Sequence, residues 1–170
     1  MNLKRSGILT GTAGVYFVAS QLAAKGFHAA ITFGNAPNVD ILVGSPDGAA
    51  TLSLQVKTSM HATRAKGKGG KKKWHHYEWY LGIKSAGLNQ PGLFFAFVSL
   101  KGMDKEMPDV FIVPSMFVHD RFERDVKAKP SMLRWHPLIE TFEPFKNNWD
   151  SLREYLNDDA LTNHGSGAMK

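Results

Sequence analysis

Three polar residues, Asp40, Gln55 and Lys57, have the types and spacing of a divalent-metal site. Two of them belong to one tripeptide, Gln55-Val56-Lys57. Carboxylate and amide oxygens are ligands that Mg²⁺ accepts, and a nearby lysine can stabilise the charge that develops on a phosphoryl group. With a bound metal, such a set has the chemistry needed to hydrolyse a phosphodiester bond.

Two segments with alternating side chains are predicted to hold these residues. Residues 51–57 alternate polar and apolar side chains, and residues 39–43 place Asp40 opposite an apolar face. This period of two is typical of half-buried strands. Between the segments lies Asp47-Gly48, a strong hairpin signal because both positions tolerate a positive φ. The sequence therefore predicts a hairpin.

The length of the hairpin loop decides which residue faces Asp40. If Asp47-Gly48 is a two-residue loop, Asp40 lies opposite Gln55; a four-residue loop, 45–48, places it opposite Ser53. A shift by one residue would instead turn Asp40 into the core. Both loop lengths predict that Asp40, Gln55 and Lys57 share one face of the sheet.

On these residues the chain resembles the PD-(D/E)xK nuclease superfamily, whose restriction-endonuclease-like fold includes Holliday-junction resolvases and small phage and defence nucleases. The matching pieces are a helical stretch at 14–22, the segment 38–41 and the segment 55–58, within residues 10–118. The resemblance implies Mg²⁺, or Mn²⁺, bound by Asp40, Gln55 and the Val56 backbone carbonyl. It also implies that Lys57 is the catalytic lysine.

Two features depart from the family pattern. The helix glutamate that the family often carries is Val15 here, and Gln21 occupies the other plausible position. Gln55 replaces the commoner glutamate of the tripeptide. Asp40 then supplies the only carboxylate, so we expect weak metal binding that a substrate phosphate completes. Glu78 is a candidate to replace the missing carboxylate from a different helix.

A basic segment follows the tripeptide. The chain has 21 basic and 15 acidic residues, and residues 57–76 contain seven basic residues and no acidic one. Its glycines predict a mobile loop, 61–73, that follows a phosphate backbone with little sequence preference and a steep salt dependence. The alternative is a solubilising loop or a targeting-like basic run. Besides Lys57, its basic residues are Arg64, Lys66, Lys68, Lys71, Lys72 and Lys73.

Residues 74–81 are predicted to form a helix. Trp74, Tyr77 and Leu81 fall on one helical stripe, which indicates core packing. His75 and His76 would point in different directions on such a helix, and the chain has no cysteine to complete a zinc site. We expect at most phosphate contacts from these two histidines.

The remaining segments predict a scaffold of mixed α/β (α+β) class, with a restriction-endonuclease-like central mixed sheet flanked by helices. An apolar run at 93–100 indicates a strand buried on both faces. We expect a single domain over residues 1–156 and a flexible tail at 157–170. The other expected elements are strands at 27–33 and 109–113 and helices at 115–127 and 148–156.

Composition narrows the class of protein. With 170 residues, of which 43% are hydrophobic, one domain with one core is the natural size. The absence of cysteine fits a reducing cytoplasm. We expect no secretion signal, no membrane-spanning run, no phosphate-binding glycine loop and no Ser-His-Asp set.

These features favour a metal-dependent endonuclease that acts on DNA, with RNA not excluded as a partner. One alternative is an inactive nuclease-like module that binds DNA or protein, because the helix carboxylate is missing. Another is an accessory or immunity factor whose basic loop meets an acidic protein. Because cutting both strands usually needs two sites, we expect a homodimer.

Overall fold

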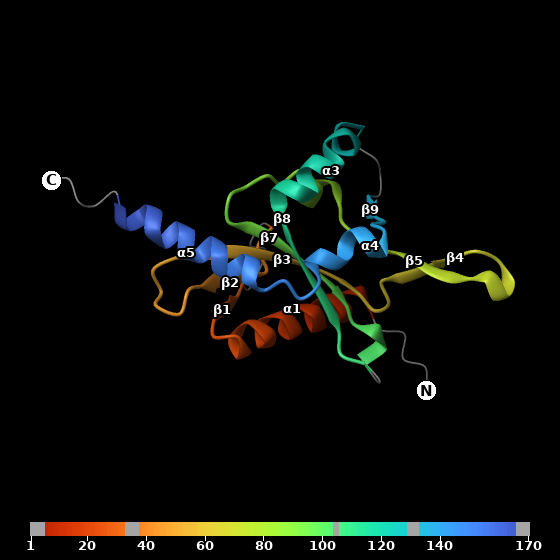
Figure 1. Cartoon of the computed structure of the whole chain (residues 1–170), viewed down its shortest axis with the longest axis horizontal. Helices are drawn as coiled ribbons and strands as arrows, with labels where there is room; N and C mark the ends of the chain where they lie inside the picture. Colours follow the sequence, from red (N-terminus) through yellow and green to blue (C-terminus); the bar gives the residue numbers. More distant parts are fainter. Residues whose placement is uncertain (1–5, 33–37, 104–105, 129–132, 166–170) are drawn as a thin grey trace.

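A five-stranded mixed sheet forms the centre of the molecule (Figure 1). The computed structural model describes residues 6–32, 38–103, 106–128 and 133–165. β3 and β7 run parallel, and all other neighbours in the sheet are antiparallel. The mixed α/β class predicted from the sequence is therefore confirmed. In spatial order the strands are β1 (His28–Ile31), β2 (Ile41–Gly44), β3 (Thr51–Ser59), β7 (Leu93–Ser99) and β8 (Asp109–Pro114).

Helices cover both faces of this sheet, so two separate cores form. The helices α1 (Gly7–Ala24) and α5 (Asp150–Gly165) contribute to the first core. The second core contains residues of α3 (Ser115–Ala128) and α4 (Ile139–Phe142). Every residue of β7 is buried, as its continuous apolar run predicts, because alternate side chains enter alternate cores.

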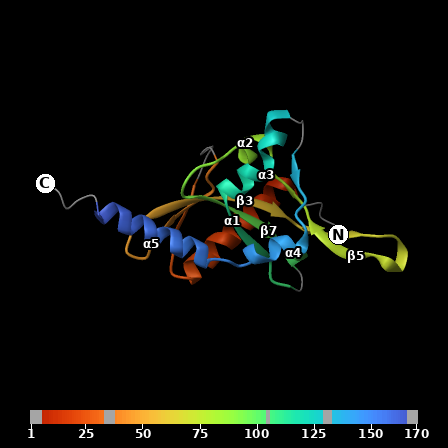
Figure 2. The same cartoon turned by 45° about the horizontal axis from the view of Figure 1, so that its top comes forward.

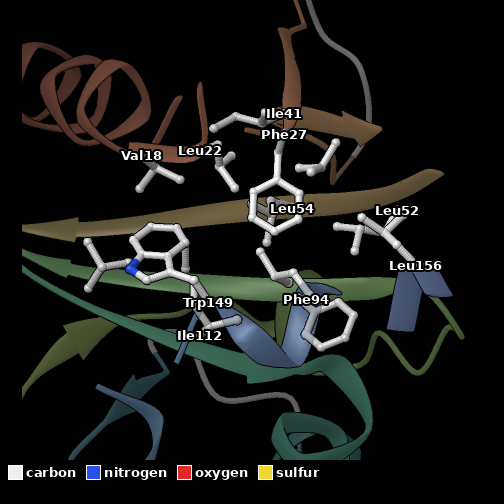
Figure 3. Packing of buried hydrophobic residues seen from close by; sticks show 14 of the residues in the cluster. Val18, Leu22, Phe27, Ile41, Leu52, Leu54, Phe94, Ile112, Trp149 and Leu156 are labelled. Atoms are coloured by element: carbon white, nitrogen blue, oxygen red, sulfur yellow. The ribbon is translucent and has the colours of Figure 1, made fainter. Parts of the chain in front are cut away.

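The first core is mainly aliphatic. Val18 and Leu22 of α1 pack over the strand residue Leu54 (Figure 3). Trp149, directly before α5, and Leu156 within it close the core. All five side chains are at most 6% exposed. Burial of this kind is the main force that attaches the two helices to the sheet.

The second core is aromatic. Trp79 lies against Phe97, Phe111 and Phe142, with ring centroids 5.3 to 5.6 Å apart. Its indole Nε1 donates a hydrogen bond to the Val98 carbonyl at 2.9 Å. The short strands β6 (Trp79–Tyr80) and β9 (Arg134–Trp135) pair with each other here. Remaining short elements are α2 (Ile83–Ala86), η1 (Gly69–Lys71), η2 (Lys101–Met103) and η3 (Glu143–Phe145).

Helix α1 approaches β3 very closely. A Cβ atom at Gly14 would lie 1.9 Å from the Thr58 hydroxyl oxygen, so only glycine allows this crossing. The helix ends before Gly26, as predicted, where φ is +86°. Contrary to the sequence expectation, this helix is long and apolar enough to cross a membrane, judged by length and composition alone.

The β2–β3 hairpin adopts the register predicted for a two-residue loop. Ile41 pairs with Leu54, which makes Gln55 the residue in line with Asp40. The loop itself is longer, because Ser45 and Ala50 still pair through a 3.0 Å backbone hydrogen bond. The register is therefore confirmed, although the loop spans residues 46–49.

Two predictions for residues 61–81 are wrong. The basic segment forms a β-hairpin of β4 (Thr63–Lys66) and β5 (Lys73–Tyr77), and residues 74–81 contain strands where a helix was predicted. The decisive pattern is that Tyr77, Trp79 and Leu81 are buried, while Glu78 is partly exposed and Tyr80 is exposed. That period of two, with aromatic residues favouring strands, outweighs the helical stripe.

The final helix is also longer than predicted. α5 continues through Gly165, past the expected end at residue 156. Its buried anchors, Trp149, Leu152 and Leu156, all lie in or before its first half. The distal turns extend away from the sheet in Figure 1, so the helix continues beyond the apolar pattern that predicts it. Residues 166–170 of the predicted tail lie outside the described residues.

Candidate active site

Asp40 lies at the entrance of β2 and is tied to β3 through its backbone and its side chain. Its N–H donates to the Leu54 carbonyl at 2.8 Å. Its carboxylate Oδ2 accepts a hydrogen bond from the Val56 N–H at 2.7 Å. The hairpin register thus holds the carboxylate against the tripeptide 55–57, because these contacts are set by the pairing of the two strands.

Gln55 occupies the middle of β3 and is only 8% exposed. Its side-chain oxygen Oε1 is buried and has no hydrogen-bond partner among the described residues. An unpaired buried amide oxygen costs roughly 1 to 3 kcal/mol. Such an oxygen is available to a cation, so this donor fits a hard metal such as Mg²⁺.

Lys57 follows on the same strand, two residues further. Gln55 and Lys57 are opposite Phe95 and Phe97 of β7, so both project from the same side of the sheet, as the alternation predicts. Burial lowers the pKa of Lys57 below its ordinary value, and the charge of Asp40 partly opposes this shift. The two side chains are therefore electrostatic neighbours.

A cleft of about 330 Å³ lies beside Asp40, between α1 and the hairpin. Val56 lines it from β3, and Thr12, Val15 and Tyr16 line it from α1. Val15, the position where the family resemblance places a glutamate, therefore faces the same cleft as Asp40. Gln21 lines a different cleft with Trp149 and is not part of this group. Among the described residues, no three His, Cys, Asp or Glu side chains are grouped to hold a metal.

Glu78 does not replace the missing carboxylate. Its Oε1 accepts a hydrogen bond from Arg64 at 3.1 Å, and its Oε2 lies 3.1 Å from His136 Nε2. Arg134 is 3.6 Å away. Burial alone would raise the pKa of Glu78, but the hydrogen bond and charge of Arg64, with Arg134 and His136, lower it overall. This carboxylate is an ion-pair centre.

His75 and His76 lie in strand β5, so the prediction that they diverge on a helix is wrong. Their Nδ1 atoms are 3.2 Å apart, and the His76 ring lies 5.6 Å from that of His136. Burial, His136 and His75 together lower the pKa of His76. The contact arises at an irregularity in the β4–β5 pairing between Arg64 and Ala65.

The predicted nucleic-acid contacts gather on the β4–β5 hairpin, which extends away from the rest of the protein (Figure 2). Lys66 and Lys73 pair across its strands, and Lys68, Lys71 and Lys72 lie around its turn, all exposed. Sequence reasoning missed Arg134 and His136, which reach this region from β9 and the residues after it. Their distance along the chain leaves no local pattern that would reveal them.

Comparison with known proteins adds a fold-level finding. No protein-family model and no curated protein sequence matches this chain. Among solved structures, the chain resembles a bacterial homing endonuclease, I-Ssp6803I, with a TM-score of 0.58 and 14% sequence identity. The match covers 92% of this chain and 98% of that one. The two proteins thus share the same overall fold.

Proposed function

We propose that this protein is a metal-dependent endonuclease that hydrolyses DNA phosphodiester bonds. The observation that carries the proposal is the arrangement of Asp40, Gln55 and Lys57. A fixed carboxylate, an unpaired buried amide oxygen and a lysine of lowered pKa lie within one strand pair. The fold shared with a homing endonuclease supports the same activity.

Asp40 and Gln55 would hold the metal through their side-chain oxygens, with the Val56 carbonyl as a third protein ligand. When bound, Mg²⁺ supplies polarisation of a phosphoryl oxygen and a more acidic bound water. A single carboxylate makes a weak site, so a substrate phosphate is expected to complete the ligand set. Binding of metal and DNA should therefore be mutually dependent.

Lys57 has one of two roles in this site. In its neutral form, which burial favours, it accepts a proton from the attacking water. In its charged form, which Asp40 favours, it stabilises the negative charge that develops on the phosphorane. Both roles require the amine at this position, so loss of the amine should abolish cleavage.

The test is cleavage of supercoiled plasmid with Mg²⁺ or Mn²⁺, comparing the natural protein with Lys57→Ala. Lys84→Ala, which removes an exposed lysine of α2, is the matched control. We expect nicked or linear product from the natural protein and the control, and none from Lys57→Ala. Cleavage that survives in Lys57→Ala would eliminate this mechanism.

The second candidate is an inactive nuclease-like module that binds DNA. The apolar side chain of Val15 in the cleft beside Asp40 favours it, because no carboxylate reaches the site from α1. This candidate predicts salt-sensitive retention of plasmid, no metal requirement and no product. The same gel distinguishes the two functions, since retarded but uncut plasmid would support the module.

A further inference from the structure

The β4–β5 hairpin is a projecting ribbon. Its strands form a separate two-stranded sheet, which joins the body at its base, where His76 bridges to Leu138 and Tyr77 enters the aromatic core. The part toward the turn points away from both cores (Figures 1 and 2). Its exposed side chains near the turn include Trp74, which is 70% exposed. Because this part of the ribbon buries little, packing does not explain its composition.

The ribbon has two chemically different faces. Residues paired across antiparallel strands share a face, so Lys66 with Lys73 and Arg64 with His76 form one face. The pairing irregularity leaves His75 as the extra residue and thereby brings His76 to this basic side. The opposite face carries Ala65 paired with Trp74. Strand pairing therefore turns Lys66 away from Trp74, while Lys72 and Lys73 line one pocket with the Trp74 ring.

The basic face continues onto the body of the protein. At the base of the ribbon, Arg64 meets Arg134 and His136 around Glu78. Arg134 and His136 remain about half exposed, while Glu78 is only 22% exposed. This basic surface therefore presents cations to a ligand, while the Glu78 carboxylate beneath it is mostly buried. Among the described residues in these contacts, Glu78 is the only acidic one.

We propose that this ribbon enters the major groove of duplex DNA with its basic face toward the DNA. Arg134 and His136, at the base of the ribbon, contact the DNA backbone at the edge of the groove. The inference rests on the proposed function for its substrate class, DNA, and adds that the substrate is a duplex read from the major groove. Glu78 lies between Arg64 of the ribbon and Arg134 of the body, at 3.1 and 3.6 Å.

Dimensions support a duplex in the major groove. Two paired strands are about 5 Å apart, and with side chains such a ribbon fits a groove about 12 Å wide. The minor groove, about 6 Å wide, does not admit it. The strands of four and five residues, with the turn, give enough length to reach the groove floor.

Single-stranded DNA is the competing ligand for this ribbon. A single-strand site needs aromatic rings that stack on bases beside cations that follow the backbone. Trp74 lines one pocket with Lys72 and Lys73, so the experiment has to distinguish the two substrates. A duplex uses the paired Lys66 and Lys73 without the ring, whereas a single strand depends on Trp74.

The experiment measures binding without cleavage, in the presence of Mg²⁺, with the Lys57→Ala protein, which is expected not to cut, as background. A 30-base-pair duplex and its separate strands are the probes, and dimethyl sulfate reports on guanine N7 in the major groove and adenine N3 in the minor groove. Lys66→Ala with Lys73→Ala tests the basic face, and Trp74→Ala tests the other. Lys84→Ala with Lys127→Ala removes the same charge from α2 and α3.

We expect saturating protein to protect guanine N7 and to bind duplex better than single strands. The basic-face double variant should lose about tenfold in duplex affinity and about two units of salt slope, with N7 protection lost. Trp74→Ala and the control double variant should stay within about twofold of the background protein. Circular dichroism should show equal folding for all variants.

Three results would overturn the inference. Protection of adenine N3 alone would place the protein in the minor groove. Preferred binding of single strands that collapses in Trp74→Ala would make the ribbon a stacking platform. Equal losses of duplex affinity in the two double variants would show that the ribbon contributes only nonspecific positive charge. If duplex binding is confirmed but plasmid is never cut, the proposed activity fails while the ribbon inference stands; if no DNA binds, both fail.

Discussion

The β2–β3 strand pair and the β4–β5 ribbon are adjacent in the chain but built on opposite principles. The strand pair lies inside the sheet, and its polar groups are held by backbone contacts such as that of Asp40 with Val56. The ribbon forms a two-stranded sheet of its own, joined to the body at its base, and exposes its lysines. Reactive groups need fixed positions, whereas phosphate contacts tolerate adjustment. Rigidity is therefore needed at the strand pair and not in the ribbon.

The strand pair also carries an energetic cost that the ribbon does not. The buried side-chain oxygen of Gln55 has no hydrogen-bond partner among the described residues, and burial lowers the pKa of the Lys57 amine. Sites of this kind commonly trade stability for activity. The exposed lysines of the ribbon carry no such cost, so substitutions in the two regions should differ in their effect on stability.

The largest expected effect is that of Lys57→Met on cleavage. Removal of the amine should reduce plasmid cutting by about 10² to 10⁴-fold. The apolar side chain should also raise the free energy of unfolding at neutral pH by roughly 0.5 to 1 kcal/mol, because a buried amine of lowered pKa is replaced. Urea unfolding and a plasmid gel on the same preparations measure both.

The gain in stability should depend on pH in a definite direction. Since the folded pKa of Lys57 lies below 10.5, the unfolded chain binds more protons between the two values. The natural protein should therefore regain stability as pH rises through this window, and the advantage of Lys57→Met should shrink. An advantage that grows with pH would contradict the assigned shift.

Trp79→Ala and a shortened ribbon should differ strongly in their effect on the free energy of unfolding. Trp79 is 1% exposed and central to the aromatic core, so its truncation should cost about 3 to 5 kcal/mol in urea unfolding. Replacement of residues 65–75 by Asn-Gly closes the hairpin between the paired Arg64 and His76. This deletion should cost less than about 1 kcal/mol, since it removes no core contact.

A comparable loss of stability in both variants would show that the ribbon is part of the core structure. The shortened protein should also lose DNA affinity. Its circular dichroism spectrum should change only by the loss of the ribbon strands. That combination would confirm that the binding and folding roles reside in different regions.

Val15→Glu should strengthen metal binding at the strand pair. It places a second carboxylate in the cleft that Asp40 lines, and a second carboxylate should raise Mn²⁺ affinity by about 10 to 100-fold in calorimetry. Gln21→Glu is the matched control, because it adds the same group to a different cleft. Equal effects of the two substitutions would show that the cleft beside Asp40 is not the metal site.

The smallest expected effect is a pH dependence of DNA binding at the ribbon base. Protonation of His76 adds positive charge beside Arg64, so affinity should rise as pH falls. Because the pKa of His76 is lowered, its share appears only below pH 6.5. The lowered pKa of Glu78 keeps that carboxylate charged over the same range.

We expect a gain of about two- to fivefold between pH 7.5 and 5.5 in duplex affinity at constant ionic strength. His76→Ala should flatten this profile. His119→Ala removes a histidine that is paired with Asp120 on α3, and it should leave the profile unchanged. An unchanged profile in His76→Ala would remove this histidine from the interface.

Local patterns in the sequence are enough to predict the β2–β3 strand pair. The period of two in residues 39–43 and 51–57, with the Asp-Gly turn, sufficed to predict the hairpin and the alignment of Asp40 with Gln55. It also sufficed for β7 and for the end of α1 at Gly26. These features depend on residues close together in the chain, so their patterns are visible locally.

Only the tertiary structure decided the form of the ribbon and its base. Residues 74–81 carry both a helical stripe and a period of two, and pairing with β4 and β9 selected strands. Arg134 and His136 join Glu78 only after β9 pairs with β6. The cleft shared by Val15 and Asp40 likewise required α1 to pack on β3 through Gly14. Each contact joins residues far apart in the chain, where packing outweighs local preference.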